Sequence, residues 1–213
     1  MARKLITEKM VIEAARFQKT MDVPKEAIVT SLARDKAKQL GIRLITTEIK
    51  KEYDPGSPLK PGAENKVALG SDHGGYALKE VIKKVLRDLK YQVVDLGTNS
   101  TQAVDYPDFA HAVALSVADG DCFRGIMIDG AGIGSCMVAN KVPGVRAAMC
   151  YDLSTAVNSR EHNNANVLTL GGKMIGELVA EQIVKVWMKT EFAGGRHQAR
   201  VDKITRNEKK YLK

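Results

Sequence analysis

The chain has 213 residues, of which 44% are hydrophobic, so it is long enough to bury one sizeable core and to carry a small appendage. Its formal net charge of +8 is compatible with nucleic acid, a membrane surface or a small anionic substrate as a partner. Aromatic residues make up only 5% and form no stacking series, and no stretch approaches the roughly 18 apolar residues of a membrane span, which argues against nucleic acid and against a membrane.

The cysteine pattern is typical of a reducing compartment. Cys122, Cys136 and Cys150 lack the paired spacing and the histidine neighbours of a zinc site, and their odd number does not indicate a disulfide framework. No long apolar run follows Arg3 and Lys4, so we expect no signal peptide. These observations predict a cytoplasmic protein without a metal or another cofactor.

The first 50 residues predict a small, mostly helical extension. Apolar residues at helical spacing predict a helix over residues 7–18 and a second helix between Ser31 and Gly41, and an alternating pattern predicts a strand at 42–47. The stretch from Lys50 to Asn65 contains three prolines and two glycines, which is linker composition. We therefore expect an extension at 1–50, a linker at 51–65 and a main domain at 66–213 that ends in a helical tail.

Short apolar strands alternate with helices throughout the main domain. The expected strands are 66–70, 92–96, 125–128, 146–150 and 167–170, and the expected helices are 76–89, 106–118, 134–141, 152–161 and 176–189. This alternation predicts an α/β fold, with a doubly wound parallel sheet in three α/β/α layers. Ligands bind such sheets beyond the carboxyl ends of the strands, so the segments that follow strands are the candidate sites.

The first of these segments is Gly-Ser-Asp-His-Gly-Gly at residues 70–75. Asp72 and His73 at a strand end can hold sugar hydroxyls or move protons, and the glycines let a ligand approach the backbone. The alternative is an aspartate that caps a helix beside a surface histidine. Local spacing does not decide between the two.

The second segment is Asp-Gly-Ala-Gly-Ile-Gly at residues 129–134. Gly130, Gly132 and Gly134 allow several backbone N–H groups to point at an oxyanion or a phosphate. The spacing matches neither the dinucleotide fingerprint nor the P-loop. Asp129 is either part of the chemistry or the cap of the next helix.

The third group lies near the C-terminus. Arg-Glu-His-Asn-Asn occupies residues 160–164, and Gly-Gly-Arg-His-Gln-Ala-Arg occupies residues 194–200. Arg196 and Arg200 are four residues apart on one helix face, which suits a dianionic phosphate. A solvated basic helix face explains the same pair without a ligand.

In combination, these segments resemble the family of ribose-5-phosphate isomerase B and the galactose-6-phosphate isomerase subunits, over roughly residues 66–205. The motifs that carry the resemblance occur in one order: Gly-Ser-Asp-His-Gly-Gly, Val-Asp-Leu-Gly-Thr, Asp105-Tyr106-Pro107, Gly-x-Gly-Ile-Gly before Ala139-Asn140-Lys141, Arg-Glu-His-Asn-Asn and Gly-Gly-Arg-His-Gln-x-Arg. The resemblance implies a metal-free aldose–ketose isomerisation through a cis-enediolate. It also implies an active site shared between the subunits of a homodimer or tetramer.

The resemblance assigns roles to matching positions. Asp72, His73 and Tyr106 would contact the sugar, and the N–H groups of residues 130–134 would form an anion hole. His162 of a neighbouring subunit would assist ring opening, with Asn163 beside it. The phosphate would bind Arg196 and Arg200, with Lys173 as an additional contact.

The chain departs from the family pattern at the catalytic base. Ribose-type members have a Cys where this chain has Asp129, and a third variant places a Glu where this chain has Ser135. The A subunit of galactose-6-phosphate isomerase is similar in having Asp, but it works with a different partner subunit. Two hypotheses follow: an isomerase in which Asp129 carries the proton between C1 and C2, or a sugar-phosphate-binding subunit without activity of its own.

The extension carries a second, less specific resemblance. Residues 23–35 together with Leu40-Gly41-Ile42 are similar to a short module on enzymes associated with bacterial microcompartments. An amphipathic helix on a linker is suited to docking in a groove of a shell or cargo partner. The alternative is a flap that packs on its own enzyme.

Overall fold

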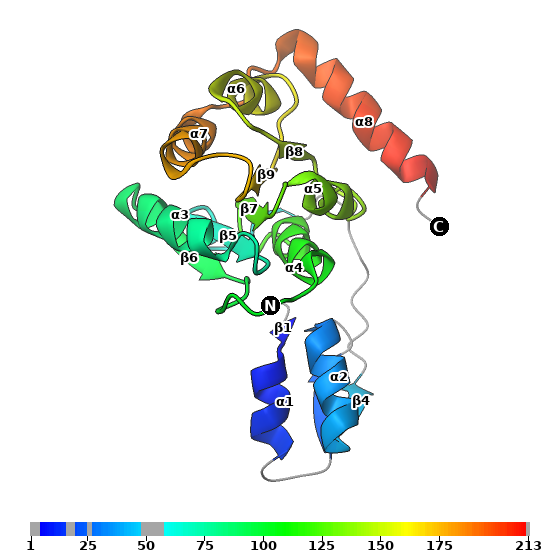
Figure 1. The fold of residues 1–213 in the computed structure, drawn as a ribbon. Helices are drawn as coiled ribbons and strands as arrows, with labels where there is room; N and C mark the ends of the chain where they lie inside the picture. Colours follow the sequence, from blue (N-terminus) through cyan, green and yellow to red (C-terminus); the bar gives the residue numbers. More distant parts are fainter. Residues whose placement is uncertain (1–4, 16–19, 25–26, 48–57, 212–213) are drawn as a thin grey trace.

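The computed structural model describes residues 5–15, 20–24, 27–47 and 58–211 (Figure 1). Residues 16–18 of the first predicted helix, residues 51–57 of the predicted linker and the last two residues lie outside these ranges. Within the described residues, none of the helices is long and apolar enough to cross a membrane.

The main domain is built on a five-stranded parallel sheet with the strand order β6-β5-β7-β9-β8. In chain order the strands are β5 (Lys66–Ser71), β6 (Gln92–Asp95), β7 (Arg124–Asp129), β8 (Ala147–Met149) and β9 (Val167–Gly171). The helices are α3 (Tyr76–Asp88), α4 (Tyr106–Ala118), α5 (Ile133–Ala139), α6 (Leu153–Glu161), α7 (Glu177–Lys189) and α8 (Gln198–Tyr211), with a short 3-10 turn at Gly195–His197 before α8. The predicted doubly wound sheet is confirmed.

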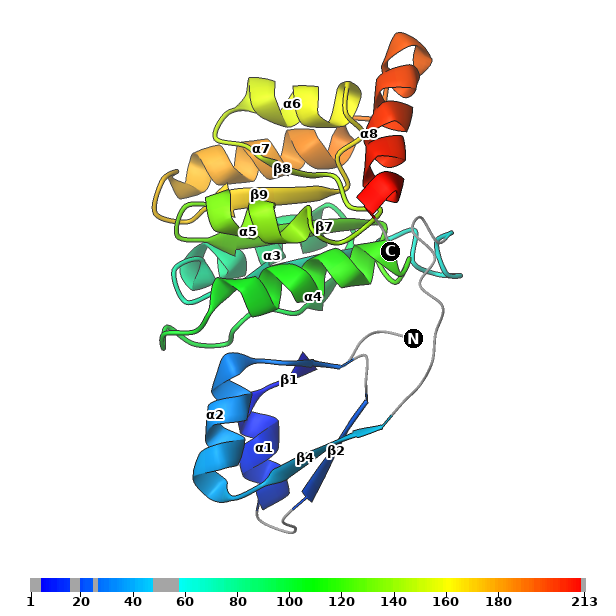
Figure 2. The same cartoon turned by 90° about the vertical axis from the view of Figure 1, so that its right-hand side faces the viewer.

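Each face of the sheet packs against its own set of helices (Figures 1 and 2). Apolar residues of α3, α6 and α7 form one core cluster with the sheet, and α4 and α5 form the other. Trp187 of α7 is the largest fully buried side chain, and every residue of β7 is buried. Burial of each large apolar side chain contributes about 1.5–3 kcal/mol, so the two clusters hold the central strands and the loops that follow them in place.

The described N-terminal segment consists of two strand–helix–strand stretches whose strands pair with each other in two small sheets. The first contains β1 (Leu5–Ile6), α1 (Glu8–Ala15) and β2 (Thr20–Pro24), and the second contains β3 (Ile28–Val29), α2 (Ser31–Leu40) and β4 (Arg43–Thr47). Parallel pairing joins β1 to β3 and β2 to β4, with Leu5 opposite Ile28 and Thr20 opposite Arg43, which is the same sequence interval in both pairs. The two predicted helices and the strand at 43–47 are present. The sequence does not predict β1, β2 or β3. β1 and β3 have only two residues each, too few to show alternation, and β2 is found through its pairing with β4.

The extension contacts the main domain at the start of α2. The backbone N and the Oγ of Ser31 donate to Asp108 Oδ2 of α4 at 2.8 and 2.9 Å. Thr30 caps the same helix, because its Oγ1 accepts from the N–H of Ala33 at 3.2 Å. A carboxylate near a helix N-terminus is stabilising, so Asp108 joins the extension to α4.

We expect Asp108→Ala to loosen this contact without unfolding the main domain. Loss of a capping carboxylate costs about 1 kcal/mol, so amide hydrogen exchange at Ser31 and Ala33 should become several-fold faster. Exchange in β5 and β7 should not change. Asp88→Ala, at the exposed end of α3, is the matched control. Equal exchange rates at Ser31 in the two variants would contradict the assigned contact.

Candidate active site

Two buried carboxylates lie side by side at the carboxyl end of the sheet. Ser71 of β5 pairs with Ile128 of β7, so Asp72, directly after β5, lies beside Asp129, the last residue of β7. Asp72 is 6% exposed and Asp129 is 5% exposed. The structure therefore brings together the first two predicted segments.

Asp129 is held by a dense set of donors. Its Oδ1 accepts from the backbone N–H of Ala131, at 2.8 Å, and from that of Gly132. Its Oδ2 accepts from the N–H of Ser135, at 3.1 Å, and from the Ser135 hydroxyl. Asp129 thus caps the start of α5, as one of the two sequence interpretations predicts. Ser135 supplies two of the four donors. In the sequence, this position stands out only because one variant of the family has a Glu there.

Asp72 has a different environment. Its Oδ1 accepts from the N–H of Gly75 at 3.0 Å, while its Oδ2 lies 3.9 Å from Nδ1 of His73. Burial raises the pKa of Asp72 above its ordinary value, and the charge of Asp129 raises it further, against the lowering effects of the Gly75 N–H and His73. Asp72 is therefore the carboxylate of the pair that takes up a proton more readily than an exposed aspartate.

His73, Tyr106 and Lys173 line the same half of the site. Nδ1 of His73 lies 3.2 Å from both the N and the O of Val104, which fixes the ring beside Asp72. The Tyr106 ring covers the first turn of α5, so closely that a Cβ on Gly134 would lie 2.5 Å from it. Lys173 is exposed and donates its backbone N–H to Gly130 O at 3.0 Å. We call these residues, with Asp72 and Asp129, the strand-end half of the site.

Tyr151 is a part of this half that sequence reasoning missed. Its hydroxyl donates to the carbonyl of Ala131 in the loop between Asp129 and α5. Tyr151 follows β8, so its position after a strand was the available signal. Its contact supports the loop rather than a ligand.

The remaining predicted residues form a second group around the 3-10 turn. The rings of His162 and His197 stack with a centroid distance of 4.1 Å and an interplanar angle of 5°. Partial desolvation lowers the pKa of His197, as do His162, Arg196 and Arg200, because a second positive charge is unfavourable there. Nδ1 of His162 lies 2.8 Å from Nδ2 of Asn158, and Asn163 contacts the same residue. This group, His162, Asn163, Arg196, His197 and Arg200, is the cationic half of the site.

Arg160 in the Arg-Glu-His-Asn-Asn motif has a structural role. Its side chain is buried and donates to Thr190 O at 3.2 Å and to Asn164 Oδ1 at 3.0 Å. Burial and the nearby Arg124 lower the pKa of Arg160 to about 10. Both arginines lie over the Trp187 ring and donate to carbonyls at or just after the end of α7, where a cation is favourable.

The two halves lie at opposite edges of the sheet. Helix α6 leaves the carboxyl end of β8 and ends at Glu161, next to the amino end of β9, so His162 lies at the amino edge. Nine helical residues span about 13 Å, whereas Asp129 lies at the carboxyl edge. One chain therefore does not bring His162 and Asp129 together.

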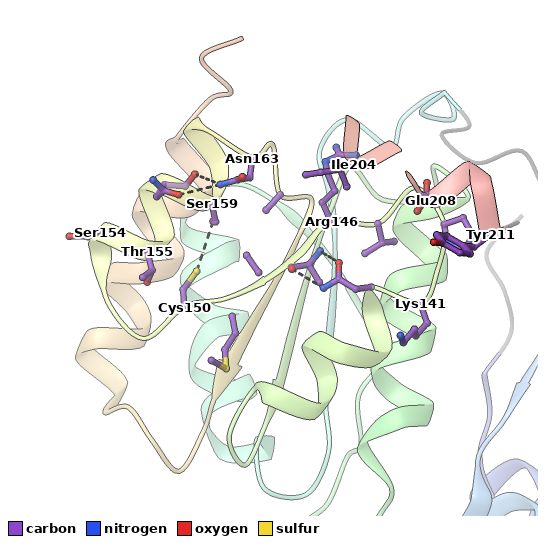
Figure 3. Close-up of a pocket in the computed structure, with 18 residues that line it drawn as sticks. Lys141, Arg146, Cys150, Ser154, Thr155, Ser159, Asn163, Ile204, Glu208 and Tyr211 are labelled. Atoms are coloured by element: carbon purple, nitrogen blue, oxygen red, sulfur yellow. Dashed lines mark hydrogen bonds between the residues drawn. The ribbon is translucent and has the colours of Figure 1, made fainter. Parts of the chain in front are cut away.

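A large groove of about 1060 Å³ runs between α5, β8, α6 and α8. Figure 3 shows Ile204, Glu208 and Tyr211 of α8 across from Ser154, Thr155 and Asn163, on or beside α6. Asn163 is the one predicted site residue in its lining; Asp72 and Asp129 are not in it. Near the groove, Met137 of α5 is 63% exposed, and Leu153 and Ile204 are also exposed.

Among the described residues, no group of three or more His, Cys, Asp and Glu side chains is arranged to hold a metal ion. Cys136 donates to Ala147 O at 3.5 Å, and burial raises the pKa of its thiol. We find no nucleophilic or metal-binding role for it.

Comparisons with known proteins show the family to which the main domain belongs. Residues 67–204 match the model of the Ribose/Galactose Isomerase family. The chain is 45% identical over 148 residues to the Putative sugar phosphate isomerase YwlF of Bacillus subtilis, covering 69% of this chain and 99% of that protein. It is 43% identical over 145 residues to ribose-5-phosphate isomerase B of Escherichia coli, covering 68% and 97%.

Solved structures show the same relationship. Ribose-5-phosphate isomerase B of Clostridium thermocellum superposes with a TM-score of 0.68 at 52% identity, covering 69% of this chain and 99% of that one. Ribose-5-phosphate isomerase B of Mycoplasma genitalium, solved with bound ribulose-5-phosphate, gives a TM-score of 0.65 at 45% identity, covering 68% and 96%. The chain belongs to the ribose/galactose isomerase family.

Proposed function

We propose that the protein interconverts an aldose phosphate and a ketose phosphate through an enediolate, with ribose 5-phosphate and ribulose 5-phosphate as the first substrate pair to test. The observation that carries the proposal is the pair of buried carboxylates at the carboxyl edge of the sheet, beside His73. Such an isomerisation needs a base that moves a proton between adjacent carbons. It also needs groups that donate protons to the hydroxyl oxygens and accept protons from them. Relatives named as sugar-phosphate isomerases support the same reaction.

We further propose that two copies of the chain complete each site. The strand-end half supplies carboxylates and His73, and the cationic half of a second copy supplies His162 and the phosphate-binding arginines. The separation of the halves within one chain supports this, because neither half alone combines a base with paired arginines. We propose the groove along β8 and α8, with its exposed apolar rim, as the surface that receives the second copy.

Two features bear on the role of Asp129. On the sequence alone, Asp129 is the proposed base, and it lies beside Asp72 within the candidate site. The N–H groups of Ala131 and Gly132, which the family resemblance assigns to an anion hole, donate instead to the carboxylate of Asp129. This favours the second candidate function, a sugar-phosphate-binding subunit that needs a catalytic partner.

Turnover by the purified full chain separates the two functions. The chain alone should convert ribose 5-phosphate to ribulose 5-phosphate, with kcat/KM higher than for galactose 6-phosphate. Saturable binding of ribose 5-phosphate without turnover of any aldose phosphate would instead establish the binding subunit.

Arg200→Ala is expected to weaken phosphate binding. A hydrogen bond to a charged group contributes about 1.5–3 kcal/mol, so KM for ribose 5-phosphate should rise about 10- to 100-fold. Arg206→Ala removes an exposed arginine from the same helix and is the matched control. Similar KM values for the two variants would rule out Arg200 as a phosphate ligand.

We also propose that residues 1–50 dock on a partner, with a microcompartment shell or cargo protein as the class to test. Ile12, Leu40 and Ile45 of this segment stay exposed, which leaves apolar surface for a partner. The contact between Ser31 and Asp108 shows that the segment also packs on its own enzyme.

A further inference from the structure

We infer that Asp72, rather than Asp129, is the base that carries the proton between C1 and C2. The inference rests on the proposed isomerase function and assigns the reacting group within it. It follows from how many of the lone pairs of each carboxylate are already engaged.

Asp129 has no acceptor capacity left. A carboxylate has about four lone-pair sites, and Asp129 receives four donors: three backbone N–H groups and the Ser135 hydroxyl. Taking a proton from carbon would require one of these hydrogen bonds to break and would remove the cap of α5.

Asp72 has the capacity that Asp129 lacks. Asp72 receives fewer donors than Asp129: its Oδ1 accepts from the Gly75 N–H at 3.0 Å, and the Gly74 N–H is the second backbone donor that lowers its pKa. The backbone holds the residue firmly, because its own N–H donates to Ile128 O at 3.3 Å. It follows β5 directly, beyond the carboxyl end of a central strand, which is where ligands bind in this class of sheet.

The charged groups around Asp72 also support its assignment as the base. Asp129 and His73 are the charged or titratable groups that act on Asp72. Burial and the repulsion from Asp129 raise the pKa of Asp72, and a base whose pKa lies closer to neutrality abstracts a carbon-bound proton more effectively. Asp129, held beside Asp72 by its four donors, thus acts as a positioning residue for its neighbour.

The step balances without a co-reactant. Asp72 Oδ2 takes the proton from C2 of the open-chain aldose, the C–H electrons form the C1–C2 double bond, and the carbonyl pair moves to O1. The proton of the C2 hydroxyl moves to O1 as the C2 carbonyl forms. Asp72 then returns its proton to C1, which gives the ketose and restores the carboxylate.

Asp72→Asn keeps the acceptor for the Gly75 N–H and removes the base. We expect kcat for ribose 5-phosphate to fall about 10²- to 10⁴-fold with KM changed little. The fall in kcat caused by Asp129→Asn should be at least about tenfold smaller than the fall caused by Asp72→Asn. Asp88→Asn, at the exposed end of α3, serves as the control. In wild type, kcat/KM should fall at acidic pH as Asp72 protonates, with an apparent pKa above the usual aspartate value of about 3.9, and Asp72→Asn should lose that limb.

A second measurement uses the wild-type chain, so it does not depend on a variant that folds. Bromoacetol phosphate alkylates a carboxylate base: a carboxylate oxygen attacks the halogen-bearing carbon, the C–Br bond breaks and bromide leaves. Peptide mass spectrometry should locate the ester on Asp72, with protection by ribose 5-phosphate. An ester on Asp129, or a larger loss of kcat in Asp129→Asn than in Asp72→Asn, would overturn the inference and leave the isomerase function intact. A wild-type chain without turnover would overturn both.

Discussion

Gly75→Ala is expected to lower the free energy of unfolding by at least about 3 kcal/mol, which corresponds to a fall in Tm of about 6–12 °C. Gly75 lies where α3 presses against the central strand β7. A Cβ at this position would lie 2.1 Å from the carbonyl oxygen of Ile128 and 2.5 Å from its carbon. Both are backbone atoms of a buried strand, so they cannot move aside as a flexible side chain does. Thermal or urea unfolding of the purified variant measures the effect.

Gly176→Ala is the matched control for this substitution. Gly176 also precedes a helix, but a Cβ there meets nothing within 4 Å. Alanine lowers the conformational entropy of the unfolded chain, which stabilises the fold, but it is a poorer N-cap than glycine, which destabilises it. The free energy of unfolding of Gly176→Ala should therefore stay within about 1 kcal/mol of wild type. Equal stabilities of the two variants would show that α3 and β7 are not in close contact.

Activity is expected to return when two inactive variants assemble together. Asp72→Asn damages the strand-end half and His162→Asn damages the cationic half, so each variant alone should retain about 10⁻² to 10⁻⁴ of the wild-type kcat. In a mixed dimer, one site receives both changes and the other receives neither. A mixed dimer isolated with two different affinity tags should therefore show about half of the wild-type activity.

The control pairs two variants of the same half. His162→Asn with Arg200→Ala leaves one change in each site of a mixed dimer, so no intact site forms. At ribose 5-phosphate concentrations well below KM, activity should remain far below that of the first mixture, because one site lacks His162 and the other binds the phosphate weakly. Recovery in neither mixture, with wild-type oligomers confirmed by sedimentation, would place both halves of the site in one chain and contradict the proposed site shared between two copies.

Most of the main-domain fold could be predicted because local pattern and tertiary structure agree there. The ten expected elements of the βα alternation are present: α4 has the predicted bounds, 106–118, and the others differ by one or two residues, as for α5, predicted at 134–141 and found at Ile133–Ala139. Buried parallel strands are nearly continuous apolar runs, and the helices that cover them carry one apolar face. Both kinds of element can therefore be recognised from the hydrophobic pattern of the sequence. The short strands β1 and β3 offer only two residues each, and what fixes them is pairing with each other.

The interactions of individual side chains were harder to predict from the sequence. Lys79 looks like a solvated helix residue, yet it is 1% exposed and its Nζ contacts Asp95 Oδ1 at 2.8 Å and Thr98 O at 2.7 Å. A buried ammonium group needs such partners, and they come from the end of β6 and the loop that follows it, which sequence spacing does not reveal. The same holds for Asp129. The sequence offered catalysis and capping as alternatives, and only the positions of four donors show how the carboxylate is engaged.

The most direct test of the proposed function follows the reaction in deuterium oxide. The full-length chain is incubated with ribose 5-phosphate, and ¹H and ¹³C spectra are recorded over time. An enediolate formed by a carboxylate base predicts that ribulose 5-phosphate appears and that solvent deuterium enters at C1 of the product, because the proton on the base exchanges with solvent. Retention of the C2 proton with no ribulose 5-phosphate formed, at protein concentrations where ribose 5-phosphate is bound, would contradict the assignment of this chain as an isomerase.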